Sequence, residues 1–393
     1  MATDASRYRR AVLVLGVGCM AASGSLRATD PLLPRLAEEF ATTPGSAALA
    51  TTAFFIGYGL LQFVHGPIGD RYGKVRVIAI QAALAALATL GCALSPGLDA
   101  LVLARLVAGM FVGAVIPLSL AWIGDVVPYA QRQAVLAKLT AWMICGTALG
   151  LSAGGWFAEN LSWRGSFFMF AALFGVSSVL LAFEWRANPV ARAAAGTARR
   201  AGVIGLLRDR WVRIIFGIVF FEAMVSFAAL AFMPLHLHRT LGYNLALSGL
   251  LVALIATGGL LYALTAARLI ARFGERGLVR YGGAIYGIGM GLVALAAQDA
   301  LVIAMLVVAG LGLYGMHGTL QVHATQMAPE ARGAAVSGFA FFLFAGQSIG
   351  SWLGSLTVDV AGTAPILLVS AVGVWLVSEF LRAQIVQRAT TRQ

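Results

Sequence analysis

The chain alternates between long apolar runs and short polar segments, and this pattern predicts membrane-spanning helices. Each run approaches the ~20 apolar residues that a helix needs to cross the hydrocarbon core of a bilayer. The runs lack the period-two alternation of barrel strands, and backbone groups in lipid must find partners within their own segment, so helices are expected. The twelve expected spans cover residues 11–33, 45–65, 77–96, 100–123, 134–157, 165–185, 211–235, 246–271, 279–298, 300–322, 334–358 and 363–382.

One long polar segment, residues 186–210, separates the first six spans from the last six. It is rich in Arg and Ala and contains Pro189. We interpret it as a cytoplasmic linker between an N-terminal six-helix bundle, residues 1–185, and a C-terminal six-helix bundle, residues 211–393. The expected fold class is therefore an all-α membrane protein.

The two halves resemble each other weakly at an offset near 200 residues. The matching positions are Arg71-Tyr72-Gly73 with Arg272-Phe273-Gly274, Gly150 with Gly350, and Gly154 with Gly354. The match is incomplete, because Ala267 and Ala271 stand where the first half has Gly66 and Asp70. Repeats of this kind predict two pseudo-symmetric bundles with a binding site between them near the middle of the membrane.

Composition agrees with an integral membrane protein, since 60% of the 393 residues are hydrophobic and 11% are charged, against ~25% charged in a soluble domain. The net charge of +12 could indicate nucleic-acid binding. With both termini placed inside, however, all but five of the 28 Lys and Arg residues fall on the cytoplasmic side. This positive-inside bias predicts a multi-pass protein of the cell membrane, in a bacterium the inner membrane, and requires no nucleic-acid partner. The five exceptions are Arg27 and Arg105, within spans, and Arg35, Arg164 and Arg239, outside.

The sequence offers no sign of a metal, cofactor or enzymatic centre. Cys19, Cys92 and Cys145 lie in apolar runs without paired spacing, so neither a disulfide framework nor a metal site is indicated. The sequence contains no nucleotide-binding loop, so we expect an ion gradient as the energy source. The scarcity of sodium-type ligand clusters favours protons.

The segment from Gly66 to Arg76 is strongly charged and lies between two apolar runs, which predicts a short loop at the membrane surface. Its glycines remove side chains where two helices would approach closely, and its charges can lock or release neighbouring helix ends. The residues concerned are Gly66, Gly69, Asp70, Arg71, Gly73, Lys74 and Arg76.

The pattern G-x-x-x-D-R-x-G-K-x-R after the second span resembles the signature loop of the major facilitator superfamily of secondary transporters. This resemblance implies twelve transmembrane helices in two six-helix bundles. It further implies that Asp70 docks on a helix end of the opposite half. By the same resemblance, Lys74 pairs with an acid at the cytoplasmic end of the fourth span, here Asp125, and these contacts latch the outward-open state.

Two ionisable residues interrupt the first span, where charge is costly and function is the default hypothesis. Arg27 and Asp30 are three residues apart on one helical face, so they may alternatively do no more than neutralise each other. The segment Thr29-Asp30-Pro31-Leu32-Leu33-Pro34 resembles the first-span motif of the drug-proton antiporter branch, which implies a proton-coupling role for Asp30.

Arg105 begins the pattern Arg-x-x-x-Gly-x-x-x-Gly in the fourth span, together with Gly109 and Gly113. A buried guanidinium needs a carboxylate or an aqueous cavity, and we expect Asp30 to be its partner. The pattern resembles a fourth-span motif of the superfamily that is associated with proton transfer in exporters. The alternative is a structural role in which Arg105 holds carbonyl groups of neighbouring helices.

Small residues in the fifth span predict close helix packing. They also resemble the antiporter signature G-x-x-x-G-P-x-x-G-G, except that Leu151 stands where that signature has proline. This departure weakens the export hypothesis. The glycines are Gly146, Gly150, Gly154 and Gly155.

The seventh span carries Glu222 near its middle, among aromatic residues, and its one basic residue, Arg213, lies at the cytoplasmic edge. We expect an isolated buried carboxylate that could exchange a proton near neutral pH. Phenyl rings suit a lipophilic or cationic substrate. A structural, hydrogen-bonded glutamate is the alternative. The aromatic cavity candidates are Phe220, Phe221 and Phe227.

Two further polar residues are cavity candidates. His317 lies in the tenth span, and its imidazole titrates near physiological pH, although histidines more often serve as hydrogen-bonding residues. Gln347 lies in the eleventh span.

Together these features predict a secondary active transporter that exports small lipophilic or cationic compounds in exchange for protons. The expected partners are a small-molecule substrate, protons and the lipid bilayer, and we expect a monomer. A proton-coupled uptake symporter or a facilitator of a small organic metabolite is the runner-up. A membrane receptor or scaffold is disfavoured, because it would have no use for buried Asp30, Arg105 and Glu222.

Overall fold

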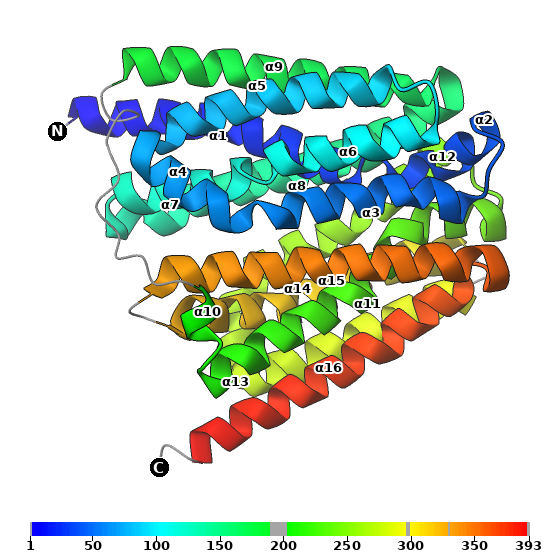
Figure 1. The fold of residues 1–393 in the computed structure, drawn as a ribbon. Coiled ribbons are helices and arrows are strands. Elements are labelled where there is room, and N and C mark those ends of the chain that lie inside the picture. Colours follow the sequence, from blue (N-terminus) through cyan, green and yellow to red (C-terminus); the bar gives the residue numbers. More distant parts are fainter. Residues whose placement is uncertain (1, 189–202, 296–298, 329–330, 391–393) are drawn as a thin grey trace.

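The structure is a computed structural model that describes residues 2–188, 203–295, 299–328 and 331–390. Within these residues every regular element is helical (Figure 1). The central part of the expected linker, residues 189–202, lies outside the described residues. Both chain ends lie on the same side of the molecule, which we call the terminal end, and the opposite side is the distal end.

The first half of the chain forms the upper layer in Figure 1. It consists of α1 (Ala2–Arg27), a short 3₁₀ turn η1 (Asp30–Leu32), α2 (Leu33–Glu39), α3 (Pro44–Leu60), α4 (Gln62–Tyr72), α5 (Lys74–Ala93), α6 (Leu98–Val112), α7 (Val115–Val126), α8 (Tyr129–Asn160) and α9 (Trp163–Ala187).

The second half forms the lower layer. It consists of α10 (Val203–Leu206), α11 (Arg210–Leu241), α12 (Leu245–Val252), α13 (Leu254–Leu295), α14 (Asp299–Gln326), α15 (Arg332–Ala361) and α16 (Ala364–Thr390).

Twelve spans emerge when broken helices are joined and one merged helix is divided. Four spans consist of two helical pieces each: α1–α2, α3–α4, α6–α7, and α12 with the first part of α13. The backbone of Gly274 leaves the helical region, at φ 64° and ψ 179°, so α13 contains the eighth and the ninth span. The twelve-helix fold class predicted from the sequence is confirmed.

The first span is interrupted where its prolines lie. Pro31 has no backbone N–H and Pro34 follows it by one turn, so a continuous helix would lose hydrogen bonds there. The chain instead forms the turn η1, which places Asp30 at a break in the helix. A second break bends α3 against α4 by 48°. The sequence analysis predicted neither break.

The charged segment 66–76 contains a shorter non-helical stretch than the sequence predicted. Residues up to Tyr72 continue α4, and α5 begins at Lys74, so among these described residues Gly73 alone is non-helical. Its φ of 90° is a value that glycine adopts readily. Polar residues at a membrane surface need not end a helix, which explains why charge pattern alone overestimated the loop. Gly274 makes the same turn in the second half, as the repeat predicts.

Close glycine contacts repeat in the two halves. A Cβ on Gly150 would overlap the carbonyl oxygen of Gly24 in α1, and a Cβ on Gly350 would overlap that of Met224 in α11. Gly146 also packs against α1, Gly154 packs against Ala28 and Pro31 at the break that follows α1, and Gly155 packs against the second half at Leu245. The small-residue positions of the fifth span therefore do serve close packing.

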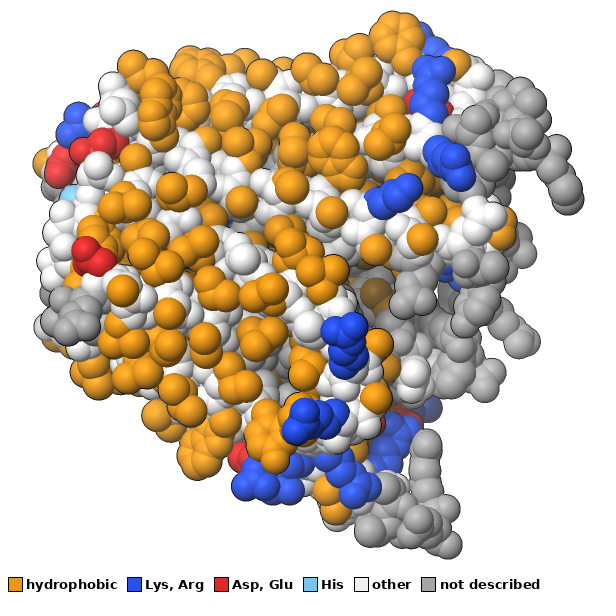
Figure 2. Space-filling model, turned by 180° about the vertical axis from the view of Figure 1, so that it is seen from behind, with side chains coloured by type: hydrophobic (Ala, Val, Ile, Leu, Met, Phe, Trp, Pro, Cys, Tyr) orange, Lys and Arg blue, Asp and Glu red, His pale blue; other side chains and the backbone are white. Residues whose placement is uncertain are grey.

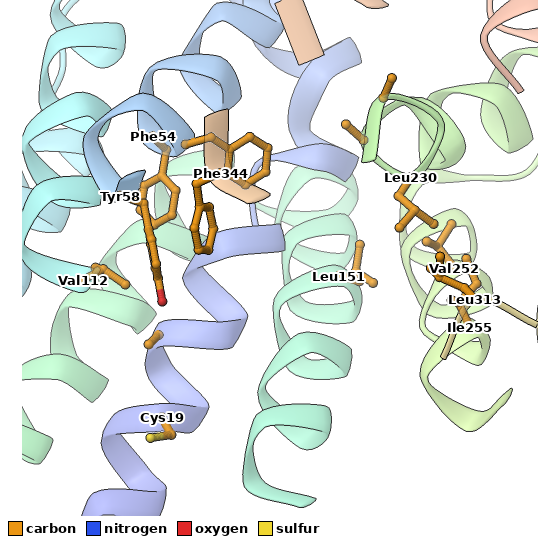
Figure 3. Packing of buried hydrophobic residues seen from close by; sticks show 14 of the residues in the cluster. Cys19, Phe54, Tyr58, Val112, Leu151, Leu230, Val252, Ile255, Leu313 and Phe344 are labelled. Atoms are coloured by element: carbon orange, nitrogen blue, oxygen red, sulfur yellow. The ribbon is translucent and has the colours of Figure 1, made fainter. Parts of the chain in front are cut away.

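Apolar side chains cover the middle of the molecule, as a membrane-embedded surface requires. Figure 2 shows hydrophobic side chains over most of one face, while Lys and Arg gather toward one end of both halves. Inside, the halves meet through aromatic contacts: the rings of Tyr58 in α3 and Phe344 in α15 stack with centroids 3.9 Å apart (Figure 3). Cys19 and Cys92 are buried as free thiols, and Cys145 is exposed.

Candidate functional site

Six charged residues of the described chain are almost completely buried. Lys74 and Glu184 lie near helix ends, at the start of α5 and the end of α9, whereas Arg27, Asp30, Arg105 and Glu222 lie within the spans. Ionisable groups at such depth are rare in membrane proteins, and they are retained where they pair or act. The contacts of each residue therefore decide which of them can take part in transport.

Arg27 and Asp30 form an ion pair, with Nη2 and Oδ2 2.9 Å apart. Apart from this contact, neither Asp30 oxygen has a hydrogen-bond partner among the described residues. The guanidinium also lies 5.9 Å from the ring centroid of Phe227 in α11. The pair thus neutralises its own charge, the alternative left open by the sequence, and in addition it meets the second half.

Arg105 does not pair with Asp30, contrary to our expectation. Its Nη2 donates a hydrogen bond to the backbone carbonyl of Ser25 at 3.3 Å. Its guanidinium stacks over Phe54, 3.8 Å from the ring centroid, and also approaches Phe167. The geometry agrees with the structural alternative, in which Arg105 holds a carbonyl of a neighbouring helix.

The sequence predicted that Glu222 is an isolated carboxylate, but in the structure His317 lies beside it. His317 Nδ1 and Glu222 Oε2 are 3.1 Å apart, between α14 and α11. The second carboxylate oxygen, Oε1, has no hydrogen-bond partner among the described residues. The partners are 95 residues apart in the chain, so their contact could not be read from one span. Two residues predicted separately therefore form one acid–base pair.

The three aromatic candidates in α11 lie in three different environments. Phe227 faces Arg27 of the other half. Phe220 is partly buried, and its backbone carbonyl packs against Gly346 of α15. Phe221 is 52% exposed and borders a groove between α11 and α16. Its assignment to the substrate cavity is wrong, because one helical step rotates it away from Glu222.

Gln347 is buried in α15, and its Oε1 has no hydrogen-bond partner among the described residues. One turn further along α15, Ser351 accepts a hydrogen bond from Thr52 of α3 at 3.0 Å. Gln347 therefore remains a polar candidate on a helix that contacts the opposite half.

Lys74 is the centre of the predicted gating cluster. Its Nζ lies 2.7 Å from Asp70 Oδ1 and 2.6 Å from Asp125 Oδ2. The contact with Asp125 is the one that the resemblance implied. Asp70, however, contacts Lys74 in its own half, and no docking on the opposite half is seen among the described residues.

The glycines of the cluster differ in role. A Cβ on Gly69 would lie 2.7 Å from Leu118 Cδ2, so this position does require close packing. No atom lies within 4 Å of a Cβ placed on Gly66 or Gly73. Close packing therefore explains only Gly69, and Gly73 is explained by its backbone turn. Arg71 lies beside Tyr72, with its guanidinium 5.2 Å from the ring centroid.

The second half keeps an acid–base contact that the sequence analysis missed. Glu275 directly follows the turn glycine Gly274, as Lys74 follows Gly73, and it contacts His323 of α14. Compared with Lys74 and Asp125, the acid and the base have exchanged places. The repeat carries the signal for this contact, because Glu275 stands at the position of Lys74.

Three comparisons with known proteins identify the family and agree with the fold. The family model described as Major Facilitator Superfamily matches residues 13–351. The uncharacterized MFS-type transporter YwfA of Bacillus subtilis (strain 168) is 30% identical over 162 residues, which cover 40% of this chain and 38% of YwfA. The match thus spans less than half the length of that relative.

A second relative is matched over a longer region. The multi-drug resistance efflux pump PmrA homolog of Lactococcus lactis subsp. lactis (strain IL1403) is 25% identical over 293 residues, 71% of each chain. The crystal structure of the nucleoside transporter NupG superposes with a TM-score of 0.74 at 14% identity, covering 96% of this chain and 98% of that one. This structural likeness concerns the fold alone.

Proposed function

Because the chain belongs to the major facilitator superfamily and is a multi-pass membrane transporter, we propose that it exports small lipophilic or cationic compounds in exchange for protons. We further propose that the bundles 1–185 and 211–393 move against each other as units. In the topology that we propose, the termini and the linker 186–210 face the cytoplasm, since the Lys and Arg residues are concentrated on that side.

The observation that carries this proposal is the contact between the buried carboxylate of Glu222 and the partly buried imidazole of His317. A carboxylate and an imidazole in contact can share, take up or release a proton, and imidazole does so near physiological pH. The unpartnered Oε1 of Glu222 leaves one oxygen available for a substrate cation or a proton. Competition between the two for one carboxylate would couple their movement in opposite directions.

The substrate site that we propose lies where Arg27 faces Phe227, because this contact joins the two halves within the interior. A phenyl ring offers an apolar surface and a face that attracts cations. The Lactococcus lactis relative is named a multi-drug resistance efflux pump homolog, which supports a substrate of this class.

Uptake by symport, or facilitated movement, remains the second candidate because of the fifth span. α8 runs without interruption from Tyr129 to Asn160, with Leu151 at the position where the antiporter signature has proline. The carbonyl of Leu151 packs against Gly249 of the second half. A helix without the proline break would suit a transporter that does not exchange substrate for protons. A receptor or scaffold would move no substrate at all.

Accumulation of ethidium in proteoliposomes distinguishes these functions, since its permanent charge prevents trapping by pH alone. The membrane potential is clamped, and protein-free vesicles serve as the control. Accumulation driven by an acidic lumen supports proton exchange. Accumulation driven by an acidic exterior, or equilibration without a gradient, would contradict export and favour the second candidate. No flux over a broad panel of compounds would favour the scaffold.

The proposed topology has its own test. In a Cys145→Ser background, Gly205→Cys should resist an impermeant maleimide applied to intact cells, and Ala361→Cys should react. The opposite pattern would reverse the orientation.

A further inference from the structure

At the distal end, each half contributes an acid that binds the start of a helix in the other half. Asp359, in the last turn of α15, accepts hydrogen bonds from the backbone N–H of Gly45 at 3.0 Å and from the hydroxyl of Thr43 at 2.6 Å. Glu159, in the last turn of α8, accepts one from the backbone N–H of Leu245 at 2.9 Å. These bonds join α15 to α3 and α8 to α12.

The two contacts are copies of each other under the internal repeat. Glu159 and Asp359 are 200 residues apart, and so are Gly45 and Leu245. The same offset relates the backbone packing beneath them. A Cβ on Gly45 would overlap the carbonyl oxygen of Ser355, and a Cβ on Gly155 would overlap that of Leu245. Recurrence in both halves argues against a chance contact.

Helix starts are suitable places for such acids, because the first backbone N–H groups have no acceptor within their own helix. Each helix already has a cap of its own. Thr43 accepts from the N–H of Ser46 at 3.1 Å, and Asn244 accepts from that of Leu247 at 2.8 Å. The acid from the other half satisfies a further N–H group, and its negative charge lies at the positive end of the helix dipole.

Local helix preference does not explain why these acids stand where they do. Both Glu159 and Asp359 lie near the C-terminus of their own helix, where the dipole disfavours negative charge. Their position becomes favourable only when the opposite helix start is close enough to donate. The charge therefore stabilises the closed arrangement of the distal end specifically.

We propose that Glu159 and Asp359 are paired gating residues that hold the distal end closed and release together when that end opens during transport. Opening separates α3 from α15 and α12 from α8, and it leaves both acids at the unfavourable ends of their own helices. This role lies outside the substrate and proton sites proposed above, and it does not depend on the direction of transport.

The test measures the separation of the two halves at the distal end. Spin labels at Asp99→Cys and Ala300→Cys, in a Cys145→Ser background, mark the starts of α6 and α14. We expect Glu159→Gln and Asp359→Asn each to raise the population at the long distance, relative to the population at the short distance, by about fivefold. This is the typical effect of losing one N-cap. The double variant should raise it further.

Glu38→Gln is the matched control. Glu38 is an acid of the distal end whose contact, with Arg35 at 2.8 Å, stays within the first half. The variant Glu38→Gln should leave the distance distribution at the distal end unchanged. Distributions that are unchanged in folded Glu159→Gln and Asp359→Asn would overturn the proposal, as would an equal shift in the control. The two variants break separate hydrogen bonds, so misfolding of one leaves the other test intact.

Discussion

Two acid–base pairs occupy the interior, and they differ in how many of their members can titrate. Arginine stays protonated at physiological pH, so in the pair of Arg27 and Asp30 only the acid can exchange a proton. In the pair of Glu222 and His317 both members can. The second pair is therefore better suited to proton coupling, and the first to fixing charge where the halves meet.

This difference predicts the behaviour of Glu222→Gln. Glutamine keeps the shape and much of the hydrogen bonding but cannot titrate, so substrate should still bind while proton release on binding falls to the level seen without substrate. Proton release from purified protein in weak buffer, with ethidium as the probe, measures this. His317→Gln should reduce the release as well. Unchanged release in Glu222→Gln would make Glu222 structural and move the coupling site to Asp30.

Asp30→Asn should act mainly on stability. It leaves the buried Arg27 without its counter-ion, and breaking a buried pair costs about 3–5 kcal/mol in the free energy of unfolding. Chemical denaturation in detergent measures the loss. Replacing both residues, in Arg27→Gln with Asp30→Asn, should restore part of it, because no unpaired charge remains.

The control for this prediction is Glu38→Gln, which breaks a pair of the same i, i+3 spacing. Arg35 and Glu38 are both exposed, so their pair is worth less than about 1 kcal/mol. A loss in Asp30→Asn as small as in Glu38→Gln would mean that water reaches Arg27.

The sequence was sufficient to predict the charged residues of the membrane interior, because an ionisable residue in an apolar run is easily recognised. It was sufficient to predict their partners only where the two residues are close in the chain. Arg27 and Asp30 are three residues apart, whereas the partner of Glu222 lies 95 residues away on another helix. The partners of Arg105 could not be predicted for a different reason. Its guanidinium contacts a backbone carbonyl and an aromatic ring, and such uncharged partners leave no charge pattern in the sequence.

At the level of helices, glycines set the distance between neighbouring axes. α8 contacts α1 through Gly146 and Gly150, and the break after α1 through Gly154, at positions where a Cβ would meet backbone atoms or a proline ring. Backbone cannot move aside as a flexible side chain can, so these contacts leave little tolerance. The same arrangement joins α15 to α11.

Gly150→Ala should therefore destabilise the protein even though alanine is the better helix former. The added methyl group would overlap the carbonyl oxygen of Gly24, and overpacking of this kind costs about 1–3 kcal/mol. Gly175→Ala in α9 is the control, since no atom lies within 4 Å of its Cβ position. Thermal unfolding in detergent should show a lower midpoint for Gly150→Ala only. Equal midpoints would mean that α1 and α8 separate at little cost.

The packing of these helices was predictable because small residues recur at helical spacing and again 200 residues later. The breaks in the spans were not predicted, although Pro31 and Pro34 mark one of them. The break between α3 and α4 falls at Leu61, shortly before Pro67, which lies inside α4. A proline inside a helix removes one hydrogen bond and crowds the carbonyl four residues earlier, so this bend also had a local signal.

For the whole molecule, the contacts between halves define which state the structure represents. Hydrogen bonds that Asp359 and Glu159 accept from helix starts of the opposite half hold the distal end closed. At the terminal end, Asp70 pairs with Lys74 of its own half. In the topology proposed here, the outer side is therefore closed, and the latch that the family resemblance assigns to Asp70 is disengaged.

This state predicts the direction in which Asp70→Asn should shift the population of conformations. In the present state the variant loses one partly exposed contact, and Lys74 keeps its contact with Asp125 at 2.6 Å, so stability should change little. The opposite state would lose the docking of Asp70 on the other half. The population should therefore shift toward the present state, and transport should fall while substrate binding survives.

Spin labels at Gly124→Cys and Gly333→Cys follow the terminal end in a Cys145→Ser background, because both positions have open space around their Cβ. Asp70→Asn should increase the fraction of long distances between them. Asp125→Asn is the matched control: its contact with Lys74 lies within the first half, so its loss should affect both states alike and leave the distribution in place. If both variants shift the distances equally, the Lys74 cluster acts as a whole, and Asp70 has no separate role between the halves.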